Sequence, residues 1–131
     1  MSTLKVNTVQ HNSTGFNNAV QFTDGAGTEN GTLCRAWVNF NGDGTVAIRN
    51  DFNVNTINDN GTGDYTMNFS NSMPDANYCF TGMSGKASDT ASLLIGIGIN
   101  ASVASGSLRF RTSNYSVSYN DHEYVCVAIF R

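Results

Sequence analysis

The strongest constraint on the fold is a pair of alternating runs on either side of the turn sequence NGDG at residues 41–44. Before the turn, Val38 and Phe40 fall on one face of an extended chain, and after it Val46 and Ile48 do the same. A hydrophobic period of two around a turn rich in glycine, asparagine and aspartate is typical of a β-hairpin with one buried face. The sequence therefore predicts a hairpin here.

The same alternation continues to the end of the chain, with turn sequences between the runs. Its candidate core residues are Tyr65, Met67, Phe69, Tyr78, Phe80, Leu108, Phe110, Tyr115, Val117, Tyr119, Val125, Val127 and Ile129. The apolar stretch 93–99 predicts a fully buried strand, and no long segment has a capped period of 3.6 residues. We expect an all-β knob domain over residues 31–131, a β-sandwich or jelly-roll-like fold of about eight antiparallel strands.

Residues 1–30 have a different character. Leu4 and Val6 alternate briefly, residues 11–18 are polar, and a short β-like patch at 19–22 precedes a turn at 24–27. Such a segment cannot build a core alone, so we predict a short extended segment that docks to another protein. We expect neither a secretory signal nor membrane insertion, because no stretch has the required apolar length.

The charge content excludes one large class of partner. Charged residues make up 13% of the chain and the net charge is -3. Without a basic surface, nucleic acid binding is not expected. A weakly charged surface of amide and hydroxyl groups favours burial between identical subunits, so we expect oligomerisation.

The chain has three widely spaced cysteines, Cys34, Cys79 and Cys126. An odd number cannot pair completely within one chain, and each lies in a β-like run. The pattern favours three buried, reduced thiols, with a disulfide between two of them as the alternative.

Two turns resemble cation sites. Residues 39–50 place a glycine at position six of a calcium-loop spacing, but position twelve is Asn50 and strands replace the flanking helices. The turn at 59–64 offers Asp59 and Asp64. We interpret both as hairpin turns, and expect no metal, no cofactor and no enzymatic activity, since no catalytic motif is present.

Two polar stretches, 84–90 and 120–123, are interpreted as exposed loops that are either merely solvated or contact a ligand. The sequence of 120–123 also permits metal or acid–base chemistry at its histidine. The candidate ligand residues are Lys86, Asp89, Asp121 and His122, with Tyr115 or Tyr119 as an aromatic ring for a sugar. The single tryptophan, Trp37, faces away from the predicted core and is expected to be an interface anchor, with sugar stacking as the alternative.

Three segments carry a resemblance to a known class of proteins: GTLCRAWVNFNG (31–42), DNGTGDYT (59–66) and MPDANY (73–78). Together they resemble a module of marine and cyanobacterial bacteriophage tail-fibre and other virion-appendage proteins. The opening STLKVNT (2–8) is similar to the starts of such chains.

The resemblance implies a virion protein that is made and assembled in the host bacterial cytoplasm. It implies a homotrimer whose exposed tip loops recognise a host receptor, a cell-surface carbohydrate, while residues 1–30 dock to other virion proteins. The alternative is a capsid decoration or cement protein with no receptor role. A lectin unconnected to particles is a third reading.

Overall fold

The structure is a computed structural model that describes residues 20–24, 27–31, 33–87, 94–98 and 102–131. The chain divides into two units, Met1–Thr32 and Leu33–Arg131. In the first unit, β1 (Val20–Asp24) pairs with β2 (Gly27–Gly31) as an antiparallel hairpin. The alternation predicted at Leu4 and Val6 lies outside the described residues.

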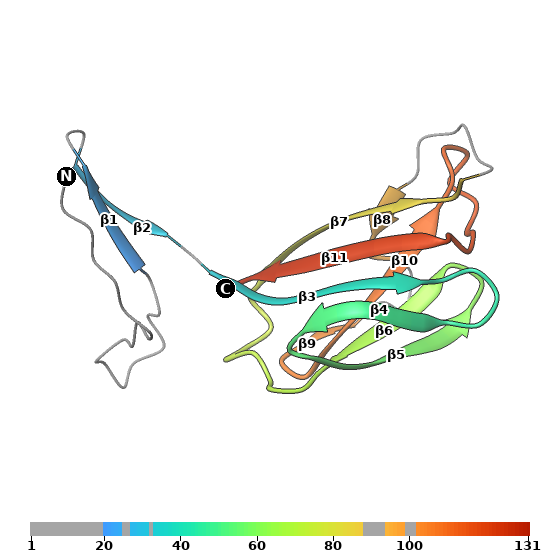
Figure 1. Cartoon of the computed structure of the whole chain (residues 1–131), viewed down its shortest axis with the longest axis horizontal. Helices are drawn as coiled ribbons and strands as arrows, with labels where there is room; N and C mark the ends of the chain where they lie inside the picture. Colours follow the sequence, from blue (N-terminus) through green and yellow to red (C-terminus); the bar gives the residue numbers. More distant parts are fainter. Residues whose placement is uncertain (1–19, 25–26, 32, 88–93, 99–101) are drawn as a thin grey trace. The chain divides into compact units, whose positions relative to one another are not determined.

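The second unit, the knob domain, is an all-β sandwich of two antiparallel sheets, as predicted (Figure 1). One sheet has the order β4-β3-β11-β7, formed by β3 (Cys34–Asn41), β4 (Ala47–Phe52), β7 (Cys79–Gly85) and β11 (Tyr124–Phe130). The other has the order β5-β6-β10-β8, with β9 beside β10. It is formed by β5 (Val54–Gly61), β6 (Asp64–Phe69), β8 (Leu94–Gly96), β9 (Val103–Ala104) and β10 (Ser107–Ser113). The described part of this domain thus has nine strands, against the eight expected.

The predicted hairpin joins β3 to β4. The Asn41 side chain donates to the carbonyl oxygens of Asp43 at 2.6 Å and Thr45 at 3.1 Å. Gly44 has a φ of 69°, in the left-handed region that glycine adopts without steric cost. These contacts account for residues 41–45 as a hairpin turn, as expected.

Asn53 marks the corner where the chain leaves one sheet for the other, between β4 and β5. Its φ is 58°, a conformation that asparagine tolerates better than most residues. Its amide nitrogen donates to the carbonyl oxygens of Arg35 at 3.1 Å and Asn71 at 3.0 Å, and its Oδ1 accepts from the Asn71 backbone nitrogen at 2.7 Å. The side chain therefore fixes the crossing to both neighbouring segments.

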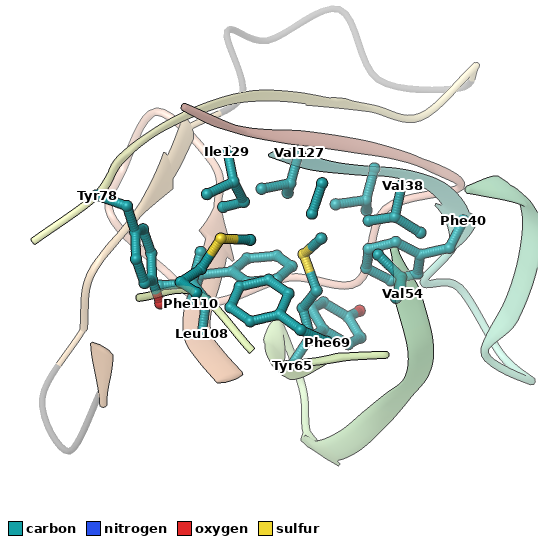
Figure 2. Packing of buried hydrophobic residues seen from close by; sticks show 14 residues of the cluster. Val38, Phe40, Val54, Tyr65, Phe69, Tyr78, Leu108, Phe110, Val127 and Ile129 are labelled. Carbon is teal, nitrogen blue, oxygen red and sulfur yellow. The ribbon is translucent and has the colours of Figure 1, made fainter. Parts of the chain in front are cut away.

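The core lies between the two sheets (Figure 2). Most of its members alternate along their strands with outward-facing residues: Ala36, Val38, Phe40, Val54, Tyr65, Met67, Phe69, Met73, Tyr78, Leu108, Phe110, Val125, Val127 and Ile129. At its centre, the Phe40 ring meets Tyr65 edge-on, with centroids 5.1 Å apart. Most of the predicted core is thereby confirmed.

Three predictions about apolar residues are wrong. The fully buried strand expected over 93–99 is described over 94–98, where only β8 is a strand, and Ile97 beyond it is half exposed. Among the described residues β8 pairs with β10 over three residues, and Ile97 lies outside that pairing. Tyr115, Val117 and Tyr119 are exposed in a loop instead of buried in a strand. The expectation of three buried thiols is wrong, since Cys34 and Cys126 are half-buried and Cys79 faces solvent, because Tyr78 and Phe80 on either side of it face the core. All three cysteines are free thiols.

Candidate functional site

Three described connections meet at one end of the knob domain, which we call the loop end. They join β3 to β4, β5 to β6 and β10 to β11, and the end of β7 lies beside them (Figure 1). The register places the start of β11 there, because Tyr124 pairs with Gly85 and Val125 with Phe40. At the other end, Phe130 pairs with Cys34, so the chain enters and leaves the knob domain away from these loops.

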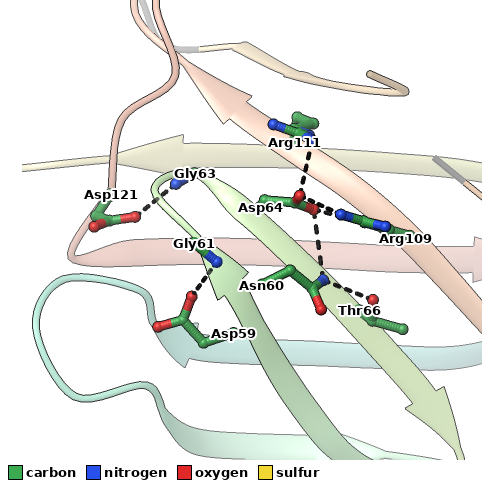
Figure 3. Close-up of polar contacts among 9 residues, drawn as sticks. All are labelled: Asp59, Asn60, Gly61, Gly63, Asp64, Thr66, Arg109, Arg111 and Asp121. Carbon is green, nitrogen blue, oxygen red and sulfur yellow. Dashed lines mark hydrogen bonds and ion pairs between the residues drawn. The ribbon is translucent and has the colours of Figure 1, made fainter. Parts of the chain in front are cut away.

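The loop end is held by a buried tyrosine hydroxyl. The hydroxyl of Tyr65 lies 2.8 Å from the carbonyl oxygen of Gly42 and 2.9 Å from Oδ1 of Asp121. The backbone nitrogen of Gly63 donates to the same Asp121 oxygen at 2.6 Å (Figure 3). Burial, together with the adjacent carboxylate, raises the pKa of Tyr65 above its ordinary value, so the hydroxyl keeps its proton. The predicted ligand residue Asp121 is thus engaged inside the protein, tying three turns together.

His122 is fully buried, so the expectation that it lies in an exposed loop is wrong. Its Nδ1 lies 2.9 Å from Oγ of Ser84, which belongs to strand β7 and not to a loop. Its carbonyl oxygen accepts from the Gly42 backbone nitrogen at 2.9 Å. A serine next to a histidine has the atoms of a nucleophile and its base. Here His122 instead joins two elements, its imidazole contacting β7 and its backbone carbonyl oxygen the β3–β4 hairpin.

The loop between β10 and β11 presents two aromatic rings to solvent. Oδ1 of Asn114 accepts from the backbone nitrogens of Ser116 and Ser118, both at 3.0 Å. Val117 has a φ of 62°, which a β-branched residue rarely adopts, so this loop holds a strained backbone in place. Tyr115 is 70% exposed and Tyr119 is 43% exposed. Both rings therefore remain available to a ligand on a loop of defined shape.

Two charged contacts involve the loop end, one on the Tyr119 ring and one between the segment after β7 and the β3–β4 hairpin. The Arg111 guanidinium stands over the Tyr119 ring, 4.3 Å from its centroid. Lys86 Nζ lies 2.7 Å from Oδ2 of Asp43, and this contact raises the pKa of Lys86. Asp89, the remaining predicted ligand residue, lies outside the described residues.

Asp64 is the centre of a charged cluster on the outer face of the five-stranded sheet (Figure 3). Its carboxylate accepts from Arg109 Nε at 2.9 Å and Nη2 at 2.6 Å, and pairs with Arg111 Nη2 at 2.8 Å. Asp64 is only 3% exposed, and the hydrogen bonds from Arg109, with the nearby Arg111 charge, lower its pKa. In the same turn, Oδ1 of Asp59 accepts from the Gly61 backbone nitrogen at 2.9 Å. The turn at 59–64 is a hairpin, and its two carboxylates have partners within the protein.

The sequence interpretation missed this cluster. Arg109 and Arg111 alternate with the core residues Leu108 and Phe110, which is enough to place both arginines on the outward face. Their meeting with Asp64 depends on the pairing of β10 with β6, where Arg111 lies opposite Asp64. That register cannot be deduced from a period of two.

Trp37 lies on the outer face of the four-stranded sheet, as the alternation predicts. It is half-buried and pairs with Phe52 on β4 and Ala128 on β11. Together with residues of β7 and β11 it lines an open hollow of about 540 Å³. The predicted interface residue and the predicted ligand residues are therefore in different parts of the domain.

The groups at the loop end can be compared with the needs of a metal ion and of a sugar. In the part of the chain that the structure describes, no three His, Cys, Asp or Glu side chains gather as they would around a metal ion. The same residues include no helix long and apolar enough to cross a membrane. Exposed aromatic rings beside amide, hydroxyl and guanidinium groups suit the apolar faces and hydroxyls of a sugar.

Comparison with protein-family models, curated proteins and solved structures finds no match to this chain.

Proposed function

We propose that this chain is a bacteriophage virion structural protein, a tail-fibre or appendage knob that recognises carbohydrate on the host cell surface. In this proposal the protein is a homotrimer of the virion, assembled in the host bacterial cytoplasm. Residues 1–30 dock to other virion proteins. It needs no cofactor or catalytic residue and binds no nucleic acid.

One structural observation supports the proposal beyond the resemblance of its sequence segments. The chain enters and leaves the knob domain at one end, where Cys34 pairs with Phe130, and the connecting loops gather at the other. A receptor-binding knob needs this polarity, since one end is attached and the other is free to meet a cell. Loops carry such contacts because they vary while the sheets keep the fold.

The contact residues in the proposal are the exposed ones. Tyr115, Tyr119 and Lys86 keep the role first considered for them, with Tyr119 positioned by Arg111. His122 and Asp121 lie inside the network that holds the loop end together. They position the loops and are not expected to touch the ligand.

The alternative, a capsid decoration or cement protein, is favoured by a different observation. The outer face of the four-stranded sheet carries an open, mostly apolar hollow, which suits permanent contact with other virion subunits. Such a protein would need no carbohydrate site at its loop end.

A glycan array of bacterial surface oligosaccharides tests the receptor role. We expect the full chain to bind at least one member, and Tyr119→Ala to weaken that binding roughly tenfold, since an aromatic contact contributes about 1 kcal/mol or more. Tyr115→Ala is expected to act in the same direction. Neither change touches the core, so the circular dichroism spectrum should stay as in the wild type.

Asn58→Ala is the matched control. Asn58 is exposed in the middle of β5, on the same domain but away from the loop end. The control variant should bind like the wild type. If no oligosaccharide binds, or if both tyrosine variants bind as well as the control, the receptor role is wrong.

A further inference from the structure

The outer faces of the two sheets differ sharply in character. On the five-stranded sheet, exposed asparagines bond to threonines of the neighbouring strand: Asn60 to Thr66 at 2.8 Å and Asn68 to Thr56 at 3.0 Å. The arginine cluster around Asp64 continues that polar surface. The outer face of the four-stranded sheet offers mostly apolar groups to water, so only this face gains much from being covered.

The hollow on the apolar face arises from the sizes of side chains on adjacent strands. On the inner strand β11, Cys126 and Ala128 are small and form its floor. Trp37 on β3 and Met83 on β7 form its two sides, and Met83 is 69% exposed. Phe52, beside Trp37 on the edge strand β4, is 54% exposed. Protruding apolar side chains and a recess that fits them thus share one surface.

A surface that carries both protruding apolar side chains and a recess offers a second copy of the same chain an apolar part to pack against. None of the residues that line the hollow is charged. Arg49 lies on the same outer face but on the edge strand β4, where its guanidinium stands over the Tyr124 ring at 4.7 Å. A contact centred on the hollow therefore brings no like charges together at its centre. These two properties point to a second copy of this chain as the occupant.

The size of the face is adequate for such a contact. Four strands about 4.8 Å apart and about seven residues long cover roughly 450 Å² in projection. Side-chain relief raises the accessible area above this figure, towards the ~600 Å² per partner of the smaller specific interfaces.

We propose that the outer face of the β4-β3-β11-β7 sheet is the contact between copies of this chain, with Met83 and Phe52 of one copy packing against the Trp37 hollow of the next. This gives the proposed oligomer its interface and therefore rests on the assembly part of the proposed function. It does not depend on carbohydrate binding.

Sedimentation velocity of the full chain tests the interface. We expect an oligomer at micromolar concentration, and a dissociation constant roughly tenfold larger or more for Met83→Lys, because a lysine at the centre of an apolar contact must be desolvated. Asn58→Lys adds the same charge to the exposed face of β5 and is expected to leave the dissociation constant unchanged. Met83 is exposed, so its replacement should not affect folding.

The fluorescence of Trp37 gives a second test that needs no substitution, because it is the only tryptophan. Its emission should shift to longer wavelength on dilution from micromolar to nanomolar concentration as the hollow becomes hydrated. A monomer whose emission does not change with concentration would overturn the proposal, and would indicate that another part of the same chain covers the face or that it stays open. An oligomer equally sensitive to both lysine variants, or to neither, would also overturn it.

The two proposals fail in different ways. A monomer that still binds oligosaccharides would remove the interface and leave the receptor role intact. An oligomer disrupted by Met83→Lys that binds no oligosaccharide would keep the interface and remove the receptor role. A dimer in place of a trimer would support this face as the contact and contradict the trimer of the proposed function.

Discussion

Asp64 shows at the scale of single residues how a charge is kept on the outside of a sheet yet almost out of water. Two arginines on β10 enclose its carboxylate, and Asn60 adds a longer contact at 3.5 Å. Because its pKa is lowered by folding, Asp64 stabilises the protein fully above the unfolded pKa of about 4. This contribution is lost as the pH falls through the lower pKa of the folded state.

We predict that Asp64→Asn lowers the free energy of unfolding by about 2–3 kcal/mol at pH 7, because charged hydrogen bonds are lost and two arginines face each other. The deficit should begin to shrink as the pH falls below about 4, because the wild-type carboxylate is then protonated in the unfolded chain, and it should vanish only below the lower pKa of the folded state. Urea denaturation at pH 7 and pH 3 measures both values.

Asp75→Asn is the matched control for this prediction. Asp75 also pairs with an arginine, at 2.7 Å from Arg131, and this contact lowers its pKa to about 2. The pair is solvent-exposed, so its loss should cost much less at pH 7. Equal effects of the two substitutions at pH 7 would contradict the account of the Asp64 cluster.

At the scale of elements, the β5–β6 turn packs against the connection between β10 and β11. Gly63 has a φ of 62°, and a Cβ built on it would lie 2.5 Å from the carbonyl oxygen of Thr112 and 2.8 Å from the backbone nitrogen of Asn120. The Thr112 backbone nitrogen also donates to the Gly63 carbonyl oxygen at 2.8 Å. Backbone atoms cannot move aside as a flexible side chain can.

We predict that Gly63→Ala destabilises the knob domain by about 3 kcal/mol, combining left-handed strain with the displacement of backbone. Gly44→Ala should cost about 1 kcal/mol, because Gly44 has a similar φ of 69° but an open surrounding. Thermal unfolding of both variants measures the difference. Equal costs would mean that the turn does not pack as described.

The sequence predicts a strand correctly where the alternation of its residues reflects one face on the core, and less well where other contacts determine the structure. The strands around Phe40, Met67 and Val127 follow from alternation, because each has one face on the core. The Tyr115 to Tyr119 segment alternates in the same way, yet Asn114 bonds to the backbone within four residues and closes a loop instead.

The candidate site was less predictable than the fold for a related reason. The exposure of Tyr115 and Tyr119 follows from that local turn. The burial of His122 is set by Ser84 and Gly42, which are distant in sequence and come near only when three connections meet. A polar sequence such as 120–123 does not reveal whether its groups face water or one another.

At the scale of the whole domain, three surfaces have three distinct characters. The loop end presents exposed aromatic rings, one outer sheet face is polar, and the other is apolar with a hollow beside Trp37. In the proposed particle, the apolar face meets other copies and the loop end remains free. The entry of the chain opposite the loop end is consistent with attachment there.

The most direct test of the account is the position of this protein on a phage particle. Antibodies raised against the purified chain, visualised with gold in electron micrographs of particles of the encoding phage, are expected to label the tail or its appendages. Label spread over the capsid shell would support the decoration protein instead. Particles without label, from infected cells that contain the protein, would contradict the proposal that this chain is part of the virion.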